Sequence, residues 1–576
     1  MTLALLLFLY PAQTLTLPQS AMAGATVELT LKSPDGSPLS GAVIRALGPA
    51  LRMATVNAVS LNVRIGPSTS VEAKGLVYRG ERLLVIAEMP DGWCEAVVSN
   101  GSKGFVSCAF LDLQPYGQPF GETDAAGHLE TSSLAVVPIA SLAIGAFVGE
   151  DRVASATIAV RPFEYEKEET IAPGITYRER RWVTNEDGPW TMQILAVDPH
   201  HPGVNLLPVR AKDQAIGREE VSSMARRYGA TAGVNAGYFV TTGAYQGGSA
   251  GVYQLNREVV SGGVSRTALI WCAEQDFVEH PLIDVVNFTG RVVATGGVSA
   301  NLLGINKPRS DSQDLTAYSP LMGPSTLTND KGVEAALDRN GRVLSVEDGK
   351  GNLQIPRDGS VLSGTGAGAT FLRQRATVGA IVLVEMSLQP VRETCAIEDV
   401  IGGGPRMIRA GKPDVTAENF AHVPMRHPRT VFAVTGRGTF LLITLDGRQA
   451  SSAGMRMDEL ADELIRLDVV DAMNLDGGGS STMVVKGDIR NVPSDGVERA
   501  VSDGLLVFSI NSFDELRSVV EAIAQDEKQI PAPARESLQT ASTVAEFKVR
   551  LEDAAPSLGA SVLRILREGA EGIKEP

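Results

Sequence analysis

One short segment combines a carboxylate, three consecutive glycines and a hydroxyl in a way that suits a charged ester. Asp476 follows an apolar run, and Gly477, Gly478, Gly479 and Ser480 come directly after it. Consecutive glycines leave their backbone N–H groups uncovered, and such amides can form a concave site for an anion. The hydroxyl of Ser480 adds a donor. The alternative is a tight structural turn, because glycine and serine are also common turn residues.

Other residues supply the groups that cleavage of a sugar–phosphate linkage requires. Glycosidases usually use two carboxyl groups, and we expect Asp446 and Asp476 to form that pair. Arginines bind phosphate oxygens through a forked pair of donors, and asparagine amides bond sugar hydroxyls. The candidates are Arg429, Arg448 and Arg499 for phosphate, and Asn235 and Asn474 for the sugar. An Asp-Gly turn at Asp446 and ordinary ion pairs for the arginines are the structural alternatives.

Strand ends must carry these residues, and the surrounding sequence is patterned accordingly. Apolar residues at 431–434 and 439–445 flank a Gly-Arg-Gly turn, which predicts a hairpin whose second strand ends at Asp446. Leucines on one face and acidic residues in the first turn predict a helix over 457–467. A buried strand over 472–475 then leads to Asp476. Upstream, a helical run at 219–228 precedes a strand that ends at Asn235.

The order of these motifs resembles the phosphodiester glycosidase family. The similar stretches run from about residue 171 to 510 and include GVNAGYF, GGGPRMIRAGK, RHPRT, LDGRQ and NLDGGGSSTMVVKG. The resemblance implies a hydrolase that breaks the bond from sugar C1 to a phosphate oxygen and leaves a phosphomonoester. It also implies that Tyr238, Gly403 and Gly404 belong to the substrate site. Asn-Ala-Gly-Tyr at 235–238 departs from the Asn-Gly-Gly-Phe of many members, which bears on the shape of the pocket.

The whole chain is expected to be a β-rich, multidomain α+β protein. Alternating patterns around a Pro-Asp-Gly turn predict strands of a β-sandwich on both sides of a different unit. That unit resembles bacterial SH3 domains in Leu61–Arg64, Gly92-Trp93 and Gly104–Ser107, so an inserted SH3-like barrel is expected. The expected divisions are sandwich halves at 24–50 and 115–162, the SH3-like unit at 52–114, a charged linker at 164–170, a mixed αβ glycosidase domain at 171–511 and a helical tail at 512–576.

The N-terminal residues and the cysteines bear on the cellular compartment. An apolar run from Leu3 to Tyr10 and an Ala-Met-Ala sequence ending at 23 predict a signal peptide over residues 1–23. We therefore expect a secreted or cell-envelope protein whose mature chain has no membrane span. Cys94 and Cys108 flank an Asn-Gly turn, and either a disulfide or two buried thiols would fit that spacing.

Charge and motif spacing limit the partners. A net charge of −15 opposes non-specific nucleic-acid binding, so no nucleic-acid partner is expected. The cysteines form no CxxC pair and the histidines are scattered, which predicts no metal site and no cofactor; a calcium ion among the acidic residues is the alternative. Residues 364–369 fit a dinucleotide fingerprint, but the sequence after them favours a strand over the required helix.

These observations together predict an exported glycosidase that acts on a glycosyl-1-phosphodiester. The expected substrate is a phosphorylated glycan, such as a cell-envelope polymer, and the SH3-like unit is expected to bind cell-wall material. A hypothesis from a different class is a non-catalytic protein that only binds envelope glycans.

Overall fold

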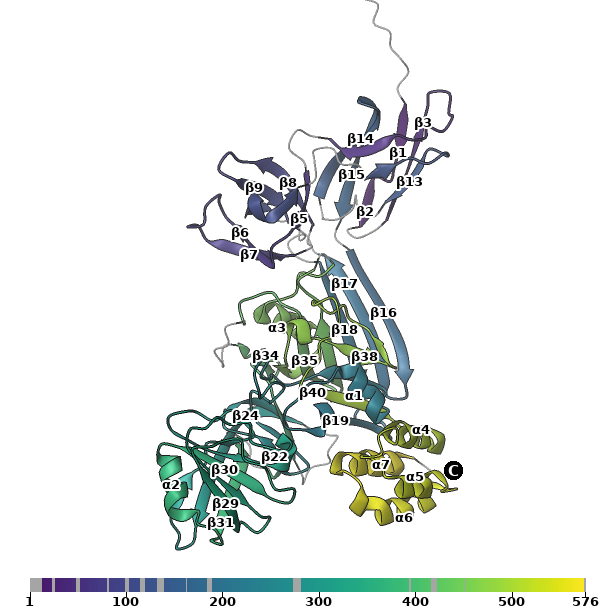
Figure 1. Ribbon diagram of the computed structural model, residues 1–576. Helices are drawn as coiled ribbons and strands as arrows, with labels where there is room; N and C mark the ends of the chain where they lie inside the picture. The colour runs from purple at the N-terminus through teal and green to yellow at the C-terminus, as the bar shows by residue number, and fades with distance from the viewer. Residues whose placement is uncertain are drawn as a thin grey trace, which may run out of the picture.

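The computed structural model arranges the chain as a column of β-rich units with helices at one end (Figure 1). It describes residues 13–22, 26–47, 52–79, 82–98, 103–113, 120–131, 139–161, 163–183, 189–272, 281–392, 395–415, 422–449 and 451–573. Within these ranges no helix has both the length and the apolar character needed to cross a membrane.

Strands from both predicted halves form two N-terminal sheets. One sheet contains β1 (Thr14–Thr16), β3 (Val27–Lys32) and β13 (His128–Thr131); the other contains β12 (Gly121–Glu122), β4 (Val43–Ala46), β14 (Ile139–Val148), β15 (Asp151–Arg161) and β2 (Ser20–Met22). The two sheets share a core that includes Leu29, Ile44 and Ile144. Alternation of apolar and polar residues along β3 buries one face of that strand, as expected for a sandwich.

The predicted signal-peptide boundary conflicts with this sandwich. Leu15 in β1 is only 8% exposed and packs in the core, and β2 pairs with β15 in parallel. Cleavage after Ala23 would therefore remove two strands whose side chains and backbone are already used in the fold. The apolar run from Leu3 to Tyr10 lies outside the described residues.

The segment between the sandwich halves forms a separate sheet with its own core. Its strands, in spatial order, are β11 (Leu111–Leu113), β5 (Arg52–Val56), β8 (Arg82–Glu88), β9 (Trp93–Val97), β10 (Lys103–Ser107), β6 (Ser60–Arg64) and β7 (Ala73–Tyr78). Cys94 and Cys108 form a disulfide, which decides between the two alternatives that the sequence left open. The resemblance of this unit to SH3 domains stays a prediction.

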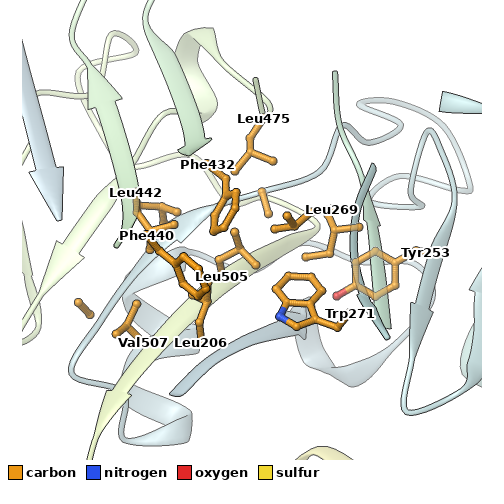
Figure 2. Packing of buried hydrophobic residues seen from close by; sticks show 14 of the residues in the cluster. Leu206, Tyr253, Leu269, Trp271, Phe432, Phe440, Leu442, Leu475, Leu505 and Val507 are labelled. Atoms are coloured by element: carbon orange, nitrogen blue, oxygen red, sulfur yellow. The ribbon is translucent and has the colours of Figure 1, made fainter. Parts of the chain in front are cut away.

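Two large sheets pack face to face within residues 163–511, the part of the chain predicted to contain a glycosidase domain and here named the glycosidase region. The first contains β16 (Phe163–Ala172), β17 (Ile175–Val183), β18 (Trp190–Val197), β36 (Phe440–Leu445), β35 (Arg429–Thr435), β37 (Val469–Asn474), β33 (Arg406–Arg409) and β34 (Lys412–Pro413); the second contains β19 (Val204–Arg210), β40 (Asp503–Ser509), β20 (Ala232–Asn235), β38 (Met483–Val485) and β39 (Asp488–Ile489). Figure 2 shows Phe432, Phe440 and Leu442 of the first sheet gathered in one core with Leu505 and Val507 of the second. The predicted hairpin is β35–β36.

The predicted charged linker at 164–170 is wrong. These residues form most of β16, which pairs with β17 along nearly its whole length. Alternating glutamates made the segment look like a solvated connection, whereas strand pairing requires only that one edge of the backbone finds a partner. Exposed charge is a common feature of strands at sheet edges, because it blocks pairing with other molecules.

A lobe built from two further sheets interrupts the glycosidase region between β20 and β33. One sheet contains β22 (Glu258–Ser261), β21 (Tyr253–Leu255), β32 (Ile397–Gly402), β23 (Arg266–Cys272), β24 (Leu282–Ala294), β25 (Ser299–Asn301) and β31 (Val382–Pro390); the other contains β26 (Gly304–Ile305), β27 (Asp314–Tyr318), β30 (Ser360–Thr365), β28 (Val333–Leu337) and β29 (Val343–Asp348). A second disulfide, Cys272–Cys395, joins the last residue of β23 to the segment just before β32, the strand with which β23 pairs, and was not predicted. Leu269 and Trp271 of β23 extend the shared core (Figure 2).

The glycine-rich segment at 364–369 leads into a helix, so the prediction of a strand after it is wrong. The helix is α2 (Ala367–Arg375). However, β30 pairs antiparallel with both β27 and β28, which is not the parallel arrangement of a dinucleotide fold. A β-carbon at Gly368 would lie 2.1 Å from the carbonyl oxygen of Asp314, so this glycine permits close helix–strand packing.

Helices cover the outer faces of the two large sheets. They are α1 (Val221–Tyr228), α3 (Met457–Arg466), α4 (Phe513–Ile523), α5 (Ala532–Gln539), α6 (Val544–Ala554) and α7 (Ala560–Gly572). α3 packs on the first sheet, and the four C-terminal helices form one core with α1 and the outer face of the second sheet. The predicted helical tail is therefore present and belongs to the glycosidase region (Figure 1).

We expect the tail to unfold together with the sheet that it covers. Leu551 on α6 is 1% exposed, so Leu551→Ala is expected to reduce the free energy of unfolding by about 2–5 kcal/mol. Tryptophan fluorescence during urea unfolding measures this, because all four tryptophans lie outside the tail. Val549→Ala is the control, since Val549 is 64% exposed on the same helix. An unchanged fluorescence midpoint for Leu551→Ala would show that the tail unfolds independently.

Candidate active site

The loop after β37 lies where the ends of strands from both large sheets meet. Leu475 is fully buried in the shared core (Figure 2), and its amide donates to the carbonyl of Thr430 in the first sheet at 2.8 Å. The next amide, of Asp476, donates to the carbonyl of Ala236 beyond the second sheet at 2.7 Å. Asp476 and Gly477 are partly exposed, while residues 478–480 are buried. The sequence thus places a partly exposed aspartate directly after a fully buried residue of the core.

Asn235 holds this loop from the second sheet. Its side-chain amide donates to the carbonyl of Asp476 at 2.6 Å, and its Oδ1 accepts from Thr430 Oγ1 at 2.8 Å and from the amide of Thr482 at 3.0 Å. The residue is completely buried. In this structure the Asn235 side chain joins both sheets to the loop, and its contact with a sugar hydroxyl stays a prediction.

The three glycines do not form the open anion site that the sequence suggested. The amides of Gly478 and Ser480 donate to backbone carbonyls of Pro428 and Gly477, and the Gly477 amide bonds the Asp476 carboxylate. A β-carbon at Gly477 would lie 2.8 Å from the carbonyl oxygen of Pro428. Gly447 and Gly454 approach the His427–Pro428 backbone equally closely. These glycines permit backbone segments to touch, which is a different use of their missing side chain.

Two of the three predicted phosphate-binding arginines lie against the remaining glycine surface. A β-carbon at Gly478 would lie 3.1 Å from Nη2 of Arg448, and one at Gly479 would lie 2.1 Å from Nη2 of Arg499. Both guanidinium groups are partly exposed. The two arginines therefore lie over the consecutive glycines that follow Asp476. Here the groups available to bind an anion are arginine side chains, whereas the sequence suggested backbone amides.

The carboxyl group of Asp476 titrates near neutrality. Desolvation by the surrounding protein raises its pKa to about 7, against the opposing effects of the Ser480 hydroxyl and the Arg499 charge. Arg499 Nη1 donates to Ser480 Oγ at 3.3 Å, and Ser480 in turn bonds Asp476. Ser480 is fully buried and thus couples the guanidinium to the carboxylate. The substrate contact of Ser480 stays a prediction.

A buried ion pair lies behind Asp476 and was missed from the sequence. Asp503 at the start of β40 accepts from Arg210 at 3.0 Å and from the amide of Gly237 at 2.5 Å. Its negative charge contributes to the raised pKa of Asp476. Gly237 thus brings its backbone close to the Asp503 carboxylate. The Ser-Asp-Gly sequence at 502–504 gave no signal that distinguished this aspartate from a turn residue.

Asp446, the other predicted catalytic carboxyl group, is buried and hydrogen-bonded within the protein. It is 1% exposed, and its oxygens accept from the Val492 amide at 3.1 Å and from Gln193 Nε2 at 3.4 Å. Burial raises its pKa to about 7. In this structure Asp446 fixes the start of the segment that carries Arg499, and its catalytic role stays a prediction.

Arg429 and the 403–404 glycines are also structural. Arg429 is 2% exposed and donates to the carbonyls of Met455 and Met425, at 3.0 and 2.5 Å, which holds the chain over the site. Gly403 and Gly404 are buried, and their amides donate to Thr267 and Asn474 backbone carbonyls. Substrate contacts of these three residues stay a prediction.

Tyr238 and Asn474 form a polar cluster beside Asp476. Asn474 Nδ2 donates to the Tyr238 hydroxyl at 2.7 Å, and that hydroxyl donates to the Gly404 carbonyl at 2.8 Å. Asn474 is 1% exposed and orients Tyr238, and its predicted contact with a sugar stays a prediction. Tyr238 is partly exposed, and burial together with the Asp476 charge raises the pKa of its hydroxyl. Tyr238 keeps its predicted place at the site.

Two histidines lie beside Tyr238 and Arg448 and were not among the predicted site residues. His422 Nε2 lies 3.2 Å from the Tyr238 hydroxyl, and His427 Nδ1 accepts from Arg448 Nε at 3.1 Å. Desolvation and the neighbouring arginines lower the pKa of His422 to about 4 and that of His427 to about 3. Both rings are therefore neutral at pH 7. The RHP motif marked His427, but nothing near residue 422 in the sequence indicated its proximity.

Metal-binding groups and cavities among the described residues bear on what the site could hold. Among those residues no group of three or more His, Cys, Asp or Glu side chains is placed to hold a metal ion. Three cavities of about 250, 320 and 440 Å³ are lined by other parts of the described structure, the first by residues beneath the helical tail. Access to the site thus rests on the partial exposure of Asp476, Arg448, Arg499 and Tyr238.

Comparison with known proteins places this site within a family match. The phosphodiester glycosidase family model matches residues 331–508, which include the Asp446 to Arg499 segment. N-acetylglucosamine-1-phosphodiester α-N-acetylglucosaminidase of mouse is 28% identical over 158 residues, covering 27% of this chain and 29% of that protein. The human enzyme of that name is 42% identical over 67 residues, covering 12% and 13%. The chain therefore matches less than a third of the length of these relatives.

A solved structure supports the fold over a longer range. It is that of a candidate exported protein from Burkholderia pseudomallei, with a TM-score of 0.52 and 20% identity, covering 86% of this chain and 96% of that one. At this identity the likeness concerns the fold alone. The sequence resemblance is confirmed by the phosphodiester glycosidase family model, which matches residues 331–508 of this chain.

Proposed function

We propose that this protein is a glycosidase that hydrolyses the C1–O bond of a glycosyl-1-phosphodiester, with N-acetylglucosamine as the first sugar to test. The observation that carries the proposal is the environment of Asp476: desolvation raises the pKa of its carboxyl group to about 7, and Arg448 and Arg499 lie over the glycines that follow it. The names of the mouse and human relatives support the choice of substrate.

Arg448 and Arg499 bind the phosphate in this proposal. Their guanidinium groups lie on Gly478 and Gly479, where no side chain keeps an anion away. Forked donors match phosphate oxygens and stabilise the charge that develops on the leaving group. Asp476 then lies next to the phosphate, on the side where the sugar C1 reacts. Its carboxylate stabilises the positive charge that builds on that carbon.

The reaction needs no strong acid in this arrangement. The C1–O bond breaks and its electron pair stays with the phosphate oxygen, which leaves as a phosphomonoester. Water supplies the hydroxyl group to C1, and its proton passes to solvent or to the phosphate. Neutral His422 and Tyr238 are placed to orient the water or a sugar hydroxyl, because both are partly exposed beside Asp476.

The proposal extends to the compartment and the natural substrate. Two disulfides are consistent with an oxidising environment, and the structural relative from Burkholderia is described as a candidate exported protein. We therefore propose a secreted or cell-envelope protein that acts on a phosphorylated glycan. The N-terminal unit at 52–114 would bind cell-wall material, and no metal cofactor is included in the proposal. Wall binding that survives deletion of residues 52–113 would exclude that role.

Turnover separates this proposal from a protein that only binds glycans. The protein is incubated with N-acetylglucosamine-1-phosphodiesters, and free sugar is measured against time. An enzyme releases sugar in proportion to protein concentration. A binding protein retains the ligand unchanged, and that result would exclude the proposed activity for these substrates.

Replacing the central carboxyl group tests its role in turnover. Asp476→Asn is expected to lower kcat on the order of 10²–10³-fold, because a neutral amide cannot stabilise positive charge at C1. Asp458→Asn is the control, since Asp458 lies on α3 with a side chain that is 67% exposed. Wild-type kcat in Asp476→Asn would exclude the assigned role.

The pH dependence tests which form of Asp476 acts. The ionised form is required, so kcat/KM is expected to rise with pH through about 7 and then level off. Arg499 lowers the pKa of Asp476, so Arg499→Gln is expected to shift the rise in kcat/KM to higher pH. A kcat/KM that falls as pH rises through 7 would assign Asp476 as an acid instead.

Stability provides a readout that does not require substrate. The pKa of Asp476 is raised from 3.8 to about 7 in the folded chain, so ionisation destabilises the fold as pH rises through that window. Asp476→Asn is therefore expected to be more stable than wild type at pH 8, by on the order of 1–2 kcal/mol after allowance for partial exposure, and equal to it at pH 4. Urea unfolding at both pH values measures the difference; a destabilised variant at pH 8 would contradict the desolvation argument.

A further inference from the structure

A carboxylate of the chain itself occupies part of the surface proposed to bind phosphate. A β-carbon at Gly479 would lie 2.3 Å from one oxygen of Asp495 and 2.1 Å from Nη2 of Arg499. Asp495 Oδ2 accepts from Arg499 at 2.8 Å through Nε and at 2.6 Å through Nη2. One negative group therefore sits on the glycine loop and holds the fork of the arginine that is expected to bind the substrate.

The contact between Asp495 and Arg499 is easy to displace. The two side chains are 36% and 35% exposed, and ion pairs of this kind contribute little net stability. Asp495 lies in a turn closed by a hydrogen bond from the Gly496 amide to the Pro493 carbonyl at 3.0 Å. Val497, which follows Gly496, is 71% exposed. Few contacts therefore fix the carboxylate in its place.

The segment around this turn is fixed at both ends. The amide of Val492 donates to buried Asp446 at 3.1 Å. Glu498 accepts from the amide and the hydroxyl of Ser222 on α1, at 2.9 and 2.6 Å. Movement of Asp495 can thus be confined to the turn between these anchors, while Arg499 stays near Gly479.

We propose that Asp495 is a specificity-determining residue that competes with phosphate for Arg499 and discriminates against dianions. The inference rests on the proposed function, because it takes Arg499 as the phosphate ligand. A phosphodiester carries one negative charge, whereas a phosphomonoester product carries nearly two above pH 7. Coulomb energy is proportional to charge, so a carboxylate beside the site repels the product about twice as strongly as the substrate. Asp495 therefore favours the diester and promotes release of the monoester.

The test measures affinity for two small probes, methyl phosphate and dimethyl phosphate, at pH 8 by ligand-observed ³¹P NMR. Asp495→Asn is expected to bind the dianionic methyl phosphate about tenfold more tightly and the monoanionic dimethyl phosphate about threefold more tightly than wild type, each tenfold being about 1.4 kcal/mol. Asp495→Ala is also expected to gain more affinity for methyl phosphate than for dimethyl phosphate, because it removes the same charge. Asp488→Asn removes the same charge from an exposed position in β39 and is expected to leave both affinities within about twofold.

Unchanged or weaker binding of methyl phosphate by Asp495→Asn would overturn the proposal, as would equal gains for the two probes. Arg499→Gln separates this failure from failure of the proposed function. If Arg499→Gln loses affinity for both probes while Asp495→Asn gains none, the phosphate site stands and the role of Asp495 is wrong. If Arg499→Gln binds both probes as wild type does, the phosphate site itself is wrong.

Discussion

Desolvation of one carboxyl group at the edge of a rigid core is the constraint on which the site depends. Asp476 follows Leu475, whose side chain is anchored where the sheets meet (Figure 2), and Asn235 fixes its carbonyl from the opposite sheet. The carboxylate therefore cannot relax toward water without disturbing both sheets. The protein destabilises the ionised form, and the Ser480–Arg499 contact only partly offsets this. Such a group is reactive near neutral pH because its charge is poorly solvated.

The other parts of the glycosidase region maintain this geometry. Asp446, Arg429 and Asn474 are almost completely buried, and each bonds backbone or side-chain atoms of a segment that borders the loop. The helical tail covers the outer face of the sheet that contains β20 and β40, which supply Asn235 and Asp503. Stability of the tail and precision of the site are therefore linked through one sheet.

Local elements near the site could be predicted from sequence, because their patterns are local. The hairpin β35–β36, the helix α3 and the strand ends at Asn235 and Asp476 all lie close to their predicted positions. The use of each polar residue could not be predicted, since it depends on partners far along the chain: Asn235 bonds Thr430 and Thr482. The role of the glycines after Asp476 could not be predicted for a similar reason. Glycine is required both for an anion site made of backbone amides and for close packing on Pro428, so the residue type does not distinguish the two.

Hydrolysis in ¹⁸O-labelled water tests the central claim most directly, because it identifies the bond that breaks. A glycosyl-1-phosphodiester is converted by the protein, and mass spectrometry locates the label. Cleavage between C1 and oxygen puts ¹⁸O in the sugar hydroxyl and none in the phosphomonoester, which is the result expected if Asp476 stabilises charge at C1. Label in the phosphate would show attack at phosphorus and would contradict the account.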